Sequence, residues 1–178
     1  MRVLGVDPGT AVTGYGVIET GNGTPGQWPM GRLIECGVIK LAKRGPLPRR
    51  LHELHAGIVE LIARHHPTAL ALEDAFYHKN VRTTLVLGHA RGVVLLAAQQ
   101  AGLDIAEYPP ATIKKTVVGA GGAAKGQVAA MVMRLLRLRQ APKPADAADG
   151  VAVALTFILR SPPPRSSPLI LKNLRDRG

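Results

Sequence analysis

The segment at residues 2–18, RVLGVDPGTAVTGYGVI, constrains the fold of this chain more than any other. An apolar run at residues 3–6 ends at Asp7, and the following pair Pro8 and Gly9 predicts a tight turn. The stretch at residues 14–18 then predicts a returning strand, so a carboxylate lies at the end of a buried strand, where a ligand can reach it. Asp-Pro-Gly is also a common turn sequence, and this segment alone leaves the role of Asp7 open.

Length and composition predict one folded domain with a basic surface. The chain has 178 residues, of which 46% are hydrophobic, and its formal net charge is +11. Such an excess of positive charge favours a polyanionic partner, most often nucleic acid. A basic protein without such a partner is the simpler alternative.

Cysteine usage and hydropathy limit the setting of the chain. The single cysteine, Cys36, excludes an internal disulfide and a cysteine-rich metal site, and it fits a reducing, intracellular environment. We expect no signal peptide, because Asp7 interrupts the first apolar run. No uninterrupted apolar stretch reaches the ~20 residues of a membrane span, so no membrane association is expected.

Periodicity predicts an α/β fold with a five-stranded mixed sheet, three antiparallel strands and then two parallel strands, flanked by helices. The expected order after the first hairpin is a loop at 21–30, a strand at 32–41, a helix between Pro48 and Pro67, a strand at 69–73, a helix at 80–100, a strand at 104–107, a helix from about 125 and a helix at 145–159. Residues 1–160 form the predicted domain, and residues 161–178 form a Pro-rich basic tail that we expect to be flexible.

Two features of the predicted helices leave alternatives open. His52 and His55 share a helical face, which makes a metal site conceivable, but without cysteine or paired carboxylates we interpret them, with His65 and His66, as surface histidines. Gly88 and Gly92 lie four residues apart in a helix, where each lowers the stability of the helix by about 1 kcal/mol relative to alanine. Close approach of another helix would explain them, within the fold or across a dimer.

Four acidic residues carry the chemical hypothesis. Glu73 repeats the Asp7 pattern of an acid at the end of an apolar strand, and Asp146 and Asp149 share one face of a helix start. Helix-dipole stabilisation, about 0.3–1 kcal/mol per acid, is the alternative for this pair. Four converging carboxylates would repel by about 4 kcal/mol per pair at ~4 Å and would hold cations instead, with Mg²⁺ or Mn²⁺ favoured. Two such ions can hydrolyse a phosphodiester.

A long basic stretch lies between the predicted fifth strand and the last helix. Residues 108–145 contain no acid and seven basic residues: Lys114, Lys115, Lys125, Arg134, Arg137, Arg139 and Lys143. The glycine-rich loop at 119–122 before a helix start suits a phosphate, although Gly126 after Lys125 excludes the Walker pattern. We interpret the stretch as a contact with a DNA or RNA backbone, and a solvated basic face is the alternative.

Four motifs resemble the RuvC family of bacterial Holliday-junction resolvases, which have an RNase H-like fold. They are DPGTAVTGYGVI from Asp7, LED from Leu72, TVVGAGGAAKGQV from Thr116 and DAADGVAVAL from Asp146. The resemblance runs from about residue 2 to residue 159. It implies that Asp7, Glu73, Asp146 and Asp149 are the catalytic, metal-binding acids, although some relatives carry histidine at the position of Asp146.

The resemblance also implies a DNA-binding set. Phe76 matches an aromatic residue that acts near the junction crossover, and Phe76 or Tyr77 could stack on an unpaired base for about 1–3 kcal/mol, with a core role as the alternative for Tyr77. Lys114 and Lys125 match basic positions near the active site. Lys79 and Arg82 are weaker candidates for backbone contacts.

The function implied by the resemblance is resolution of four-way DNA junctions in recombination and repair. A bacterial cytoplasmic homodimer, formed through the Gly88/Gly92 helix, would make paired symmetric nicks that leave 5′-phosphate and 3′-hydroxyl ends. The expected cofactors are two Mg²⁺ ions per site, with Mn²⁺ as a substitute, and RuvA and RuvB are the expected branch-migration partners. Two alternatives are an actin-like phosphotransferase, which needs a second phosphate loop and about twice the length, and a module that binds junctions without cutting.

Overall fold

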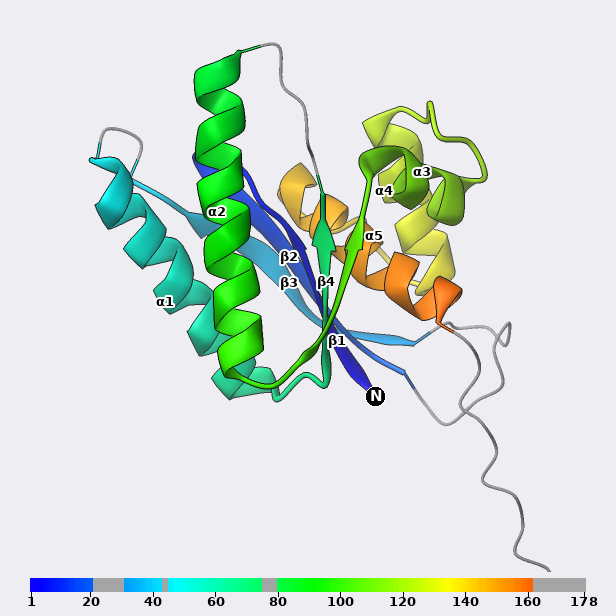
Figure 1. Cartoon of the computed structure of the whole chain (residues 1–178). Coiled ribbons are helices and arrows are strands. Elements are labelled where there is room, and N and C mark those ends of the chain that lie inside the picture. The colour runs from blue at the N-terminus through cyan, green and yellow to red at the C-terminus, as the bar shows by residue number, and fades with distance from the viewer. Residues whose placement is uncertain (21–30, 43–44, 75–79, 162–178) are drawn as a thin grey trace, which may run out of the picture.

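The computed structural model describes residues 1–20, 31–42, 45–74 and 80–161 (Figure 1). The predicted loop at 21–30 and the tail from residue 162 onward lie outside the described residues. The described part is a central sheet with helices on both faces, which confirms the predicted RNase H-like α/β class.

Five strands form one mixed sheet in the order β3-β2-β1-β4-β5. The first three are antiparallel, and β4 and β5 run parallel to β1, as the sequence predicted. The strands are β1 (Arg2–Asp7), β2 (Val12–Glu19), β3 (Arg32–Lys40), β4 (Ala69–Glu73) and β5 (Asp104–Tyr108).

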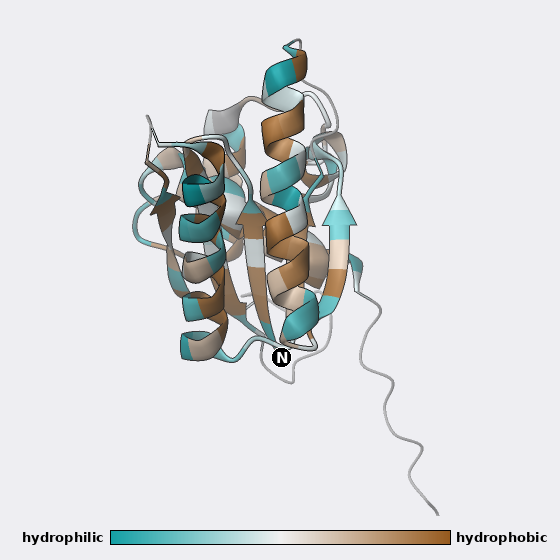
Figure 2. Ribbon diagram, turned by 60° about the vertical axis from the view of Figure 1, so that its left-hand side comes forward, coloured by the Kyte–Doolittle hydropathy of each residue, from teal (hydrophilic) through white to brown (hydrophobic). Residues whose placement is uncertain are grey.

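Two groups of helices cover the two faces of the sheet (Figures 1 and 2). One face carries α1 (Leu47–His65) and α2 (Val81–Gln100). The other carries α3 (Pro110–Val118), α4 (Lys125–Leu135) and α5 (Ala145–Arg160). Helix α3 was not predicted, although Pro110 at its start and the buried pair Ile113 and Val117, one turn apart, are ordinary helix signals.

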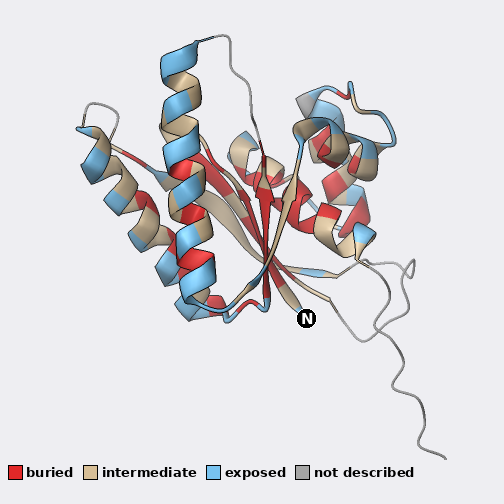
Figure 3. Cartoon of the chain, viewed as in Figure 1, coloured by how far each residue is buried: buried red, intermediate tan, exposed pale blue. Residues whose placement is uncertain are grey.

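Side-chain alternation divides the core into two clusters, and the buried residues concentrate along the sheet (Figure 3). In β1, Val3 packs toward α5, whereas Leu4 and Val6 pack toward α1 and α2. In β4, Ala71 packs toward α5 and Leu72 toward α2. Because successive residues of a strand point to opposite faces, this division fixes the direction of every side chain at the strand ends.

Helix α5 lies directly on the strand backbones of β1 and β2, because glycines remove the side chains between them. A Cβ added at Gly5 would overlap the backbone of Gly150 and Ala154, and one at Gly16 would lie within 3.0 Å of Val151. The fit is reciprocal, since a Cβ at Gly150 would lie within 3.0 Å of the Tyr15 backbone. These glycines set how closely and at which register the helix docks on the sheet.

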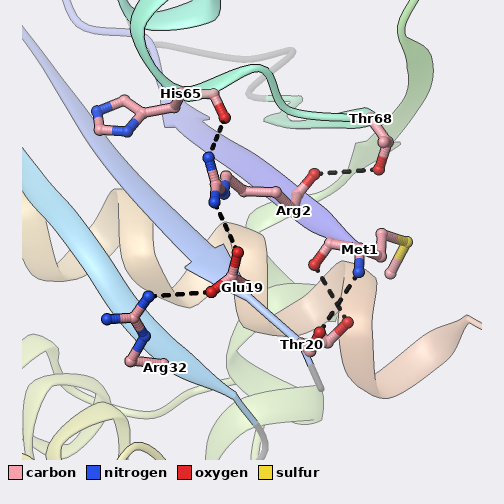
Figure 4. Close-up of polar contacts among 7 residues, drawn as sticks. All are labelled: Met1, Arg2, Glu19, Thr20, Arg32, His65 and Thr68. Carbon is pink, nitrogen blue, oxygen red and sulfur yellow. Dashed lines mark hydrogen bonds and ion pairs between the residues drawn. The ribbon is translucent and has the colours of Figure 1, made fainter. Parts of the chain in front are cut away.

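Ion pairs close the end of the sheet where β1 begins (Figure 4). Arg2 donates one hydrogen bond of 2.5 Å to the His65 carbonyl and another of 2.6 Å to Glu19 Oε1, while Arg32 lies 3.0 Å from Glu19 Oε2. These contacts hold the pKa of the Glu19 carboxyl below its ordinary value. Two arginines therefore neutralise the one carboxylate of Glu19 at this end of β1 and β2.

A second polar cluster joins β2, β3 and α1. Tyr15 donates a hydrogen bond of 2.7 Å to Glu35 Oε1, and His65 Nε2 lies 3.0 Å from Glu35 Oε2. Burial and the neighbouring carboxylate raise the pKa of Tyr15 to about 12. His65 is buried, so its interpretation as a surface histidine was wrong; it ends α1 and its imidazole packs against the strand that carries Glu35.

Helix α2 presents an apolar outer surface. Val81, Leu85 and Leu96 are 74%, 60% and 53% exposed, and a Cβ at Gly88 or Gly92 would meet nothing within 4 Å. A close helix contact within the described chain therefore does not explain the two glycines. By length and composition α2 could cross a membrane, but its inner side packs into the core with α1.

We expect Gly5→Ala to destabilise the fold by about 1–3 kcal/mol, because the added methyl group would force α5 away from β1. Chemical denaturation of the purified protein measures this change. Gly126→Ala is the matched control, since a Cβ there meets nothing within 4 Å, and it should leave stability unchanged or slightly higher. Equal stability of the two variants would contradict the close docking of α5.

Candidate active site

Asp7 and Glu73 lie side by side at the carboxyl ends of the neighbouring strands β1 and β4. We call this end of the sheet, with the start of α5, the acidic edge. Strands β1 and β4 are parallel neighbours, and their register pairs Val6 with Leu72, the residues that directly precede the two acids. Adjacent strands are about 4.8 Å apart. Side chains alternate along a strand, so Asp7 points to the same face as Val3, and Glu73 points to the same face as Ala71. Both carboxylates therefore project toward the α5 face.

The start of α5 lies over this edge. Asp7 pairs with Gly14 of β2 across the first hairpin, and a Cβ at Gly14 would overlap the carbonyl oxygen of Asp146. The first turn of α5 therefore sits on the strand residue beside Asp7. Asp149 follows one turn later, directly before Gly150, which lies against the Tyr15 backbone. Both acids of α5 therefore lie near the end of the sheet that carries Asp7.

The turn between β1 and β2 is compact for identifiable reasons. The Gly9 amide donates a hydrogen bond of 3.4 Å to Thr13 Oγ1, and a Cβ at Gly9 would overlap the carbonyl oxygen of Val12. A residue with a side chain would push the two strand ends apart. The turn thus keeps Asp7 close to Gly14 and to the start of α5.

The four acids are all partly exposed. Among the described residues, no three Asp, Glu, His or Cys side chains are already arranged to hold a metal ion. The backbone positions meet at one edge, whereas the side chains do not form a finished coordination shell. Because like charges repel, carboxylates without a bound cation favour separated rotamers. The donor set itself, oxygen only, fits a hard divalent cation such as Mg²⁺.

A cavity of about 110 Å³ opens beside Glu73, between the end of β4 and α2. Its lining residues are Pro8, Glu73, Asp74, Thr84, Leu87, Gly88 and Arg91. Gly88 thus lies on the wall of the cavity as well as on the exposed surface of α2. The acidic edge is open on this side.

The basic and aromatic candidates are only partly placed. Lys114 is half-buried on α3, which follows the end of β5 at the same edge, and Arg82 is exposed in the first turn of α2. Lys125 begins α4, after the glycine-rich loop. Phe76, Tyr77 and Lys79 lie outside the described residues.

The family model described as "Crossover junction endodeoxyribonuclease RuvC" matches residues 3–157. The chain belongs to the RuvC family. The matched range contains all four acidic residues and ends within α5.

RuvC relatives match most of the chain in sequence and in structure. The RuvC of Halorhodospira halophila is 49% identical over 154 residues, covering 86% of this chain and 87% of its own length. A Thermus thermophilus RuvC structure superimposes with a TM-score of 0.80 at 36% identity, covering 89% of this chain and 94% of its own. A structure of T. thermophilus RuvC in complex with a Holliday junction substrate has a TM-score of 0.81 at 35% identity, with coverage of 89% and 93%.

Sequence reasoning missed a group of charged residues next to Glu73. Asp74 is buried, and Arg91 of α2 lies 3.3 Å from its Oδ1 and 2.6 Å from Glu107 Oε2. The sequence contained a signal for this group. Side chains alternate along a strand, so an acid directly after Glu73 must point to the opposite face, the one covered by α2. A carboxylate buried there requires a positive partner.

We expect Gly14→Ala to weaken binding of Mn²⁺ to this RuvC-family protein at least tenfold, because the methyl group would displace the Asp146 backbone from the edge that carries Asp7. Isothermal titration calorimetry measures the affinity. Gly126→Ala is the control, since a Cβ there meets nothing within 4 Å, and it should leave the affinity for Mn²⁺ unchanged. An unchanged affinity in folded Gly14→Ala protein would contradict the assembled edge.

Proposed function

We propose that this protein is a divalent-metal-dependent endonuclease that resolves four-way DNA junctions. The observation that carries the proposal is the strand register that brings Asp7 and Glu73 together under the first turn of α5. The relatives named crossover junction endodeoxyribonuclease, and the T. thermophilus complex with a Holliday junction substrate, support the substrate class. The net charge of +11 supports a polyanionic partner.

Asp7, Glu73, Asp146 and Asp149 would hold two Mg²⁺ ions, with Mn²⁺ as a substitute. When bound, such ions activate a water molecule and stabilise the leaving oxygen of the phosphodiester. The chain's own contribution is to fix the acids on rigid elements, two at strand ends and two in the first two turns of a helix. Attack by water at the phosphorus leaves a 5′-phosphate and a 3′-hydroxyl.

The basic residues of α3 and α4 would bind the DNA backbone beside the acids. Lys114 and Lys125 are our candidates for the scissile phosphate, because α3 follows β5 at the acidic edge and α4 begins after the glycine-rich loop. Phe76 and Tyr77 would stack on bases at the crossover, and Lys79 and Arg82 would contact the backbone further along.

A homodimer formed through α2 would give two acidic sites on one junction. The support is the exposed apolar surface of Val81, Leu85 and Leu96, together with the open space over Gly88 and Gly92. Helices that carry small residues can approach each other closely, and a large exposed apolar patch is typical of an interface. Two such sites would make paired, symmetric nicks.

We expect Asp7→Asn to reduce nicking of a synthetic four-way junction by at least 10²-fold, because it removes a charged oxygen ligand. Glu73→Gln, Asp146→Asn and Asp149→Asn should behave alike. A gel assay with Mg²⁺ or Mn²⁺ measures nicking, and a binding assay without metal serves as the control, in which all four variants should bind as the unmodified protein does.

Two outcomes would contradict this function. If Asp7→Asn cleaves at the normal rate, the metal assignment is wrong. If the unmodified protein binds junctions but never nicks them with either metal, the protein is a binding module without nuclease activity.

We expect Leu85→Asp to convert the dimer to a monomer, because a charge would be placed in the proposed apolar interface. Analytical ultracentrifugation measures the mass, and the ratio of paired to single nicks on a junction should fall. Val59→Asp, which changes an exposed apolar residue of α1, is the control and should remain dimeric. A dimer of Leu85→Asp with the unmodified association constant would exclude α2 as the interface.

A further inference from the structure

Asp74 and Arg91, which line the cavity beside Glu73, form a charged triad with Glu107 that the proposed chemistry does not use. Arg91 projects from α2 between Asp74, at the end of β4, and Glu107, in β5. Its Nε donates a hydrogen bond of 2.6 Å to Glu107 Oε2 and lies 3.3 Å from Asp74 Oδ1. One guanidinium therefore connects a helix to two neighbouring strands where both approach the acidic edge.

The Asp74 carboxylate depends on this guanidinium. Asp74 is only 7% exposed, and its Oδ1 accepts no hydrogen bond within the described part of the chain. Removing a carboxylate from water is costly unless a positive charge lies nearby. Arg91 supplies that charge, so the buried side chain of Asp74 keeps its orientation only while Arg91 is present.

The orientation of Asp74 bears directly on Glu73. The Asp74 amide donates a hydrogen bond of 2.9 Å to the Tyr108 carbonyl, which extends the β4–β5 pairing by one residue past Glu73. Adjacent residues point to opposite faces, so Asp74 pointing into the α2 face requires Glu73 to point toward α5. Fixing one side chain therefore fixes the twist of the strand end that carries the other.

Charge gives a second consequence. With Arg91 in place, the three groups carry a net charge of −1, whereas without it the charges of Asp74 and Glu107 lose their shared arginine, and Asp74 lines the same cavity as Glu73. Asp74 would then turn toward the cavity and compete for a cation. An arginine that is bonded to both acids prevents this.

We propose that Arg91 is a positioning residue, which holds Asp74 and the end of β4 so that Glu73 is directed to the cation site. The inference rests on the proposed function. Arg91 acts through Asp74 and Glu107 and needs no contact with the cation or with DNA.

The test is the Mn²⁺ affinity of Arg91→Met, measured by electron paramagnetic resonance of free Mn²⁺ without DNA. Loss of such a supporting contact typically weakens metal binding 10–100-fold, and we expect a rise of that size in the dissociation constant. Nicking at saturating Mn²⁺ should recover toward the normal rate, and junction binding without metal should change less than twofold. Arg91→Met/Asp74→Asn should regain part of the affinity, because it removes the competing carboxylate but does not restore the contact that holds the end of β4.

Arg64→Met is the matched control, since Arg64 of α1 also lies between two carboxylates, 3.5 Å from Glu35 and 3.3 Å from Glu60, away from the acidic edge. It should leave Mn²⁺ affinity unchanged. If Arg91→Met fails to fold, Arg91→Lys and Glu107→Gln replace it, and each should weaken Mn²⁺ binding severalfold.

Three results would overturn the inference. One is an unchanged Mn²⁺ affinity in the folded Arg91 variants despite a lower melting temperature, which would show a purely structural role. Another is weaker junction binding without metal, which would show a direct DNA contact. A third is no recovery in the double variant. Mn²⁺ binding that is lost in Asp7→Asn but intact in Arg91→Met would remove this inference while the proposed function stands.

Discussion

The direct contact between α5 and the backbones of β1 and β2 is the constraint on which the rest of this structure depends. Gly5, Gly14 and Gly16 on the strands and Gly150 on the helix bring the two backbones into direct contact at these positions. The contact places the first turn of α5 directly on the strand ends. With side chains at these positions, the helix would lie further from the sheet. Without this contact, α5 would still be amphipathic and would still pack on the sheet. Asp146 would then not lie over Gly14, the residue of β2 that pairs with Asp7.

The two ends of β1 differ in the charged groups that surround them. At the amino end, Arg2 and Arg32 neutralise Glu19. At the carboxyl end, the register gathers acids on the α5 face, while on the α2 face Arg91 lies 3.3 Å from Asp74. In a chain with a net charge of +11, leaving acids together at one edge favours a site that a cation completes.

Much of the fold was predictable because its signals are local. The first hairpin, the five strands and the parallel placement of β4 and β5 follow from turn residues, alternation and a helical crossover. Asp7 and Glu73 could be recognised as strand-end acids for the same reason. Helix α3 was missed because the basic stretch was interpreted by its charge and not by the spacing of Ile113 and Val117.

The assembly of the site was not predictable from the residues, because it depends on contacts between distant segments. Nothing near Asp146 indicates that its backbone rests on Gly14. Likewise, His65 resembles a surface histidine until β3 brings Glu35 to its imidazole, and Asp74 has no visible partner until α2 supplies Arg91. Within the described chain, the glycines of α2 have no close neighbour, which shows that helical spacing alone did not identify what they face.

The most direct test of the account is a crystal structure of the protein with Mn²⁺, located by its anomalous scattering. We predict a Mn²⁺ peak bonded to Asp7 and to at least one residue each from β4 and the first turn of α5. A Mn²⁺ ion bound elsewhere, or acids that stay apart at a Mn²⁺ concentration that supports nicking, would contradict it.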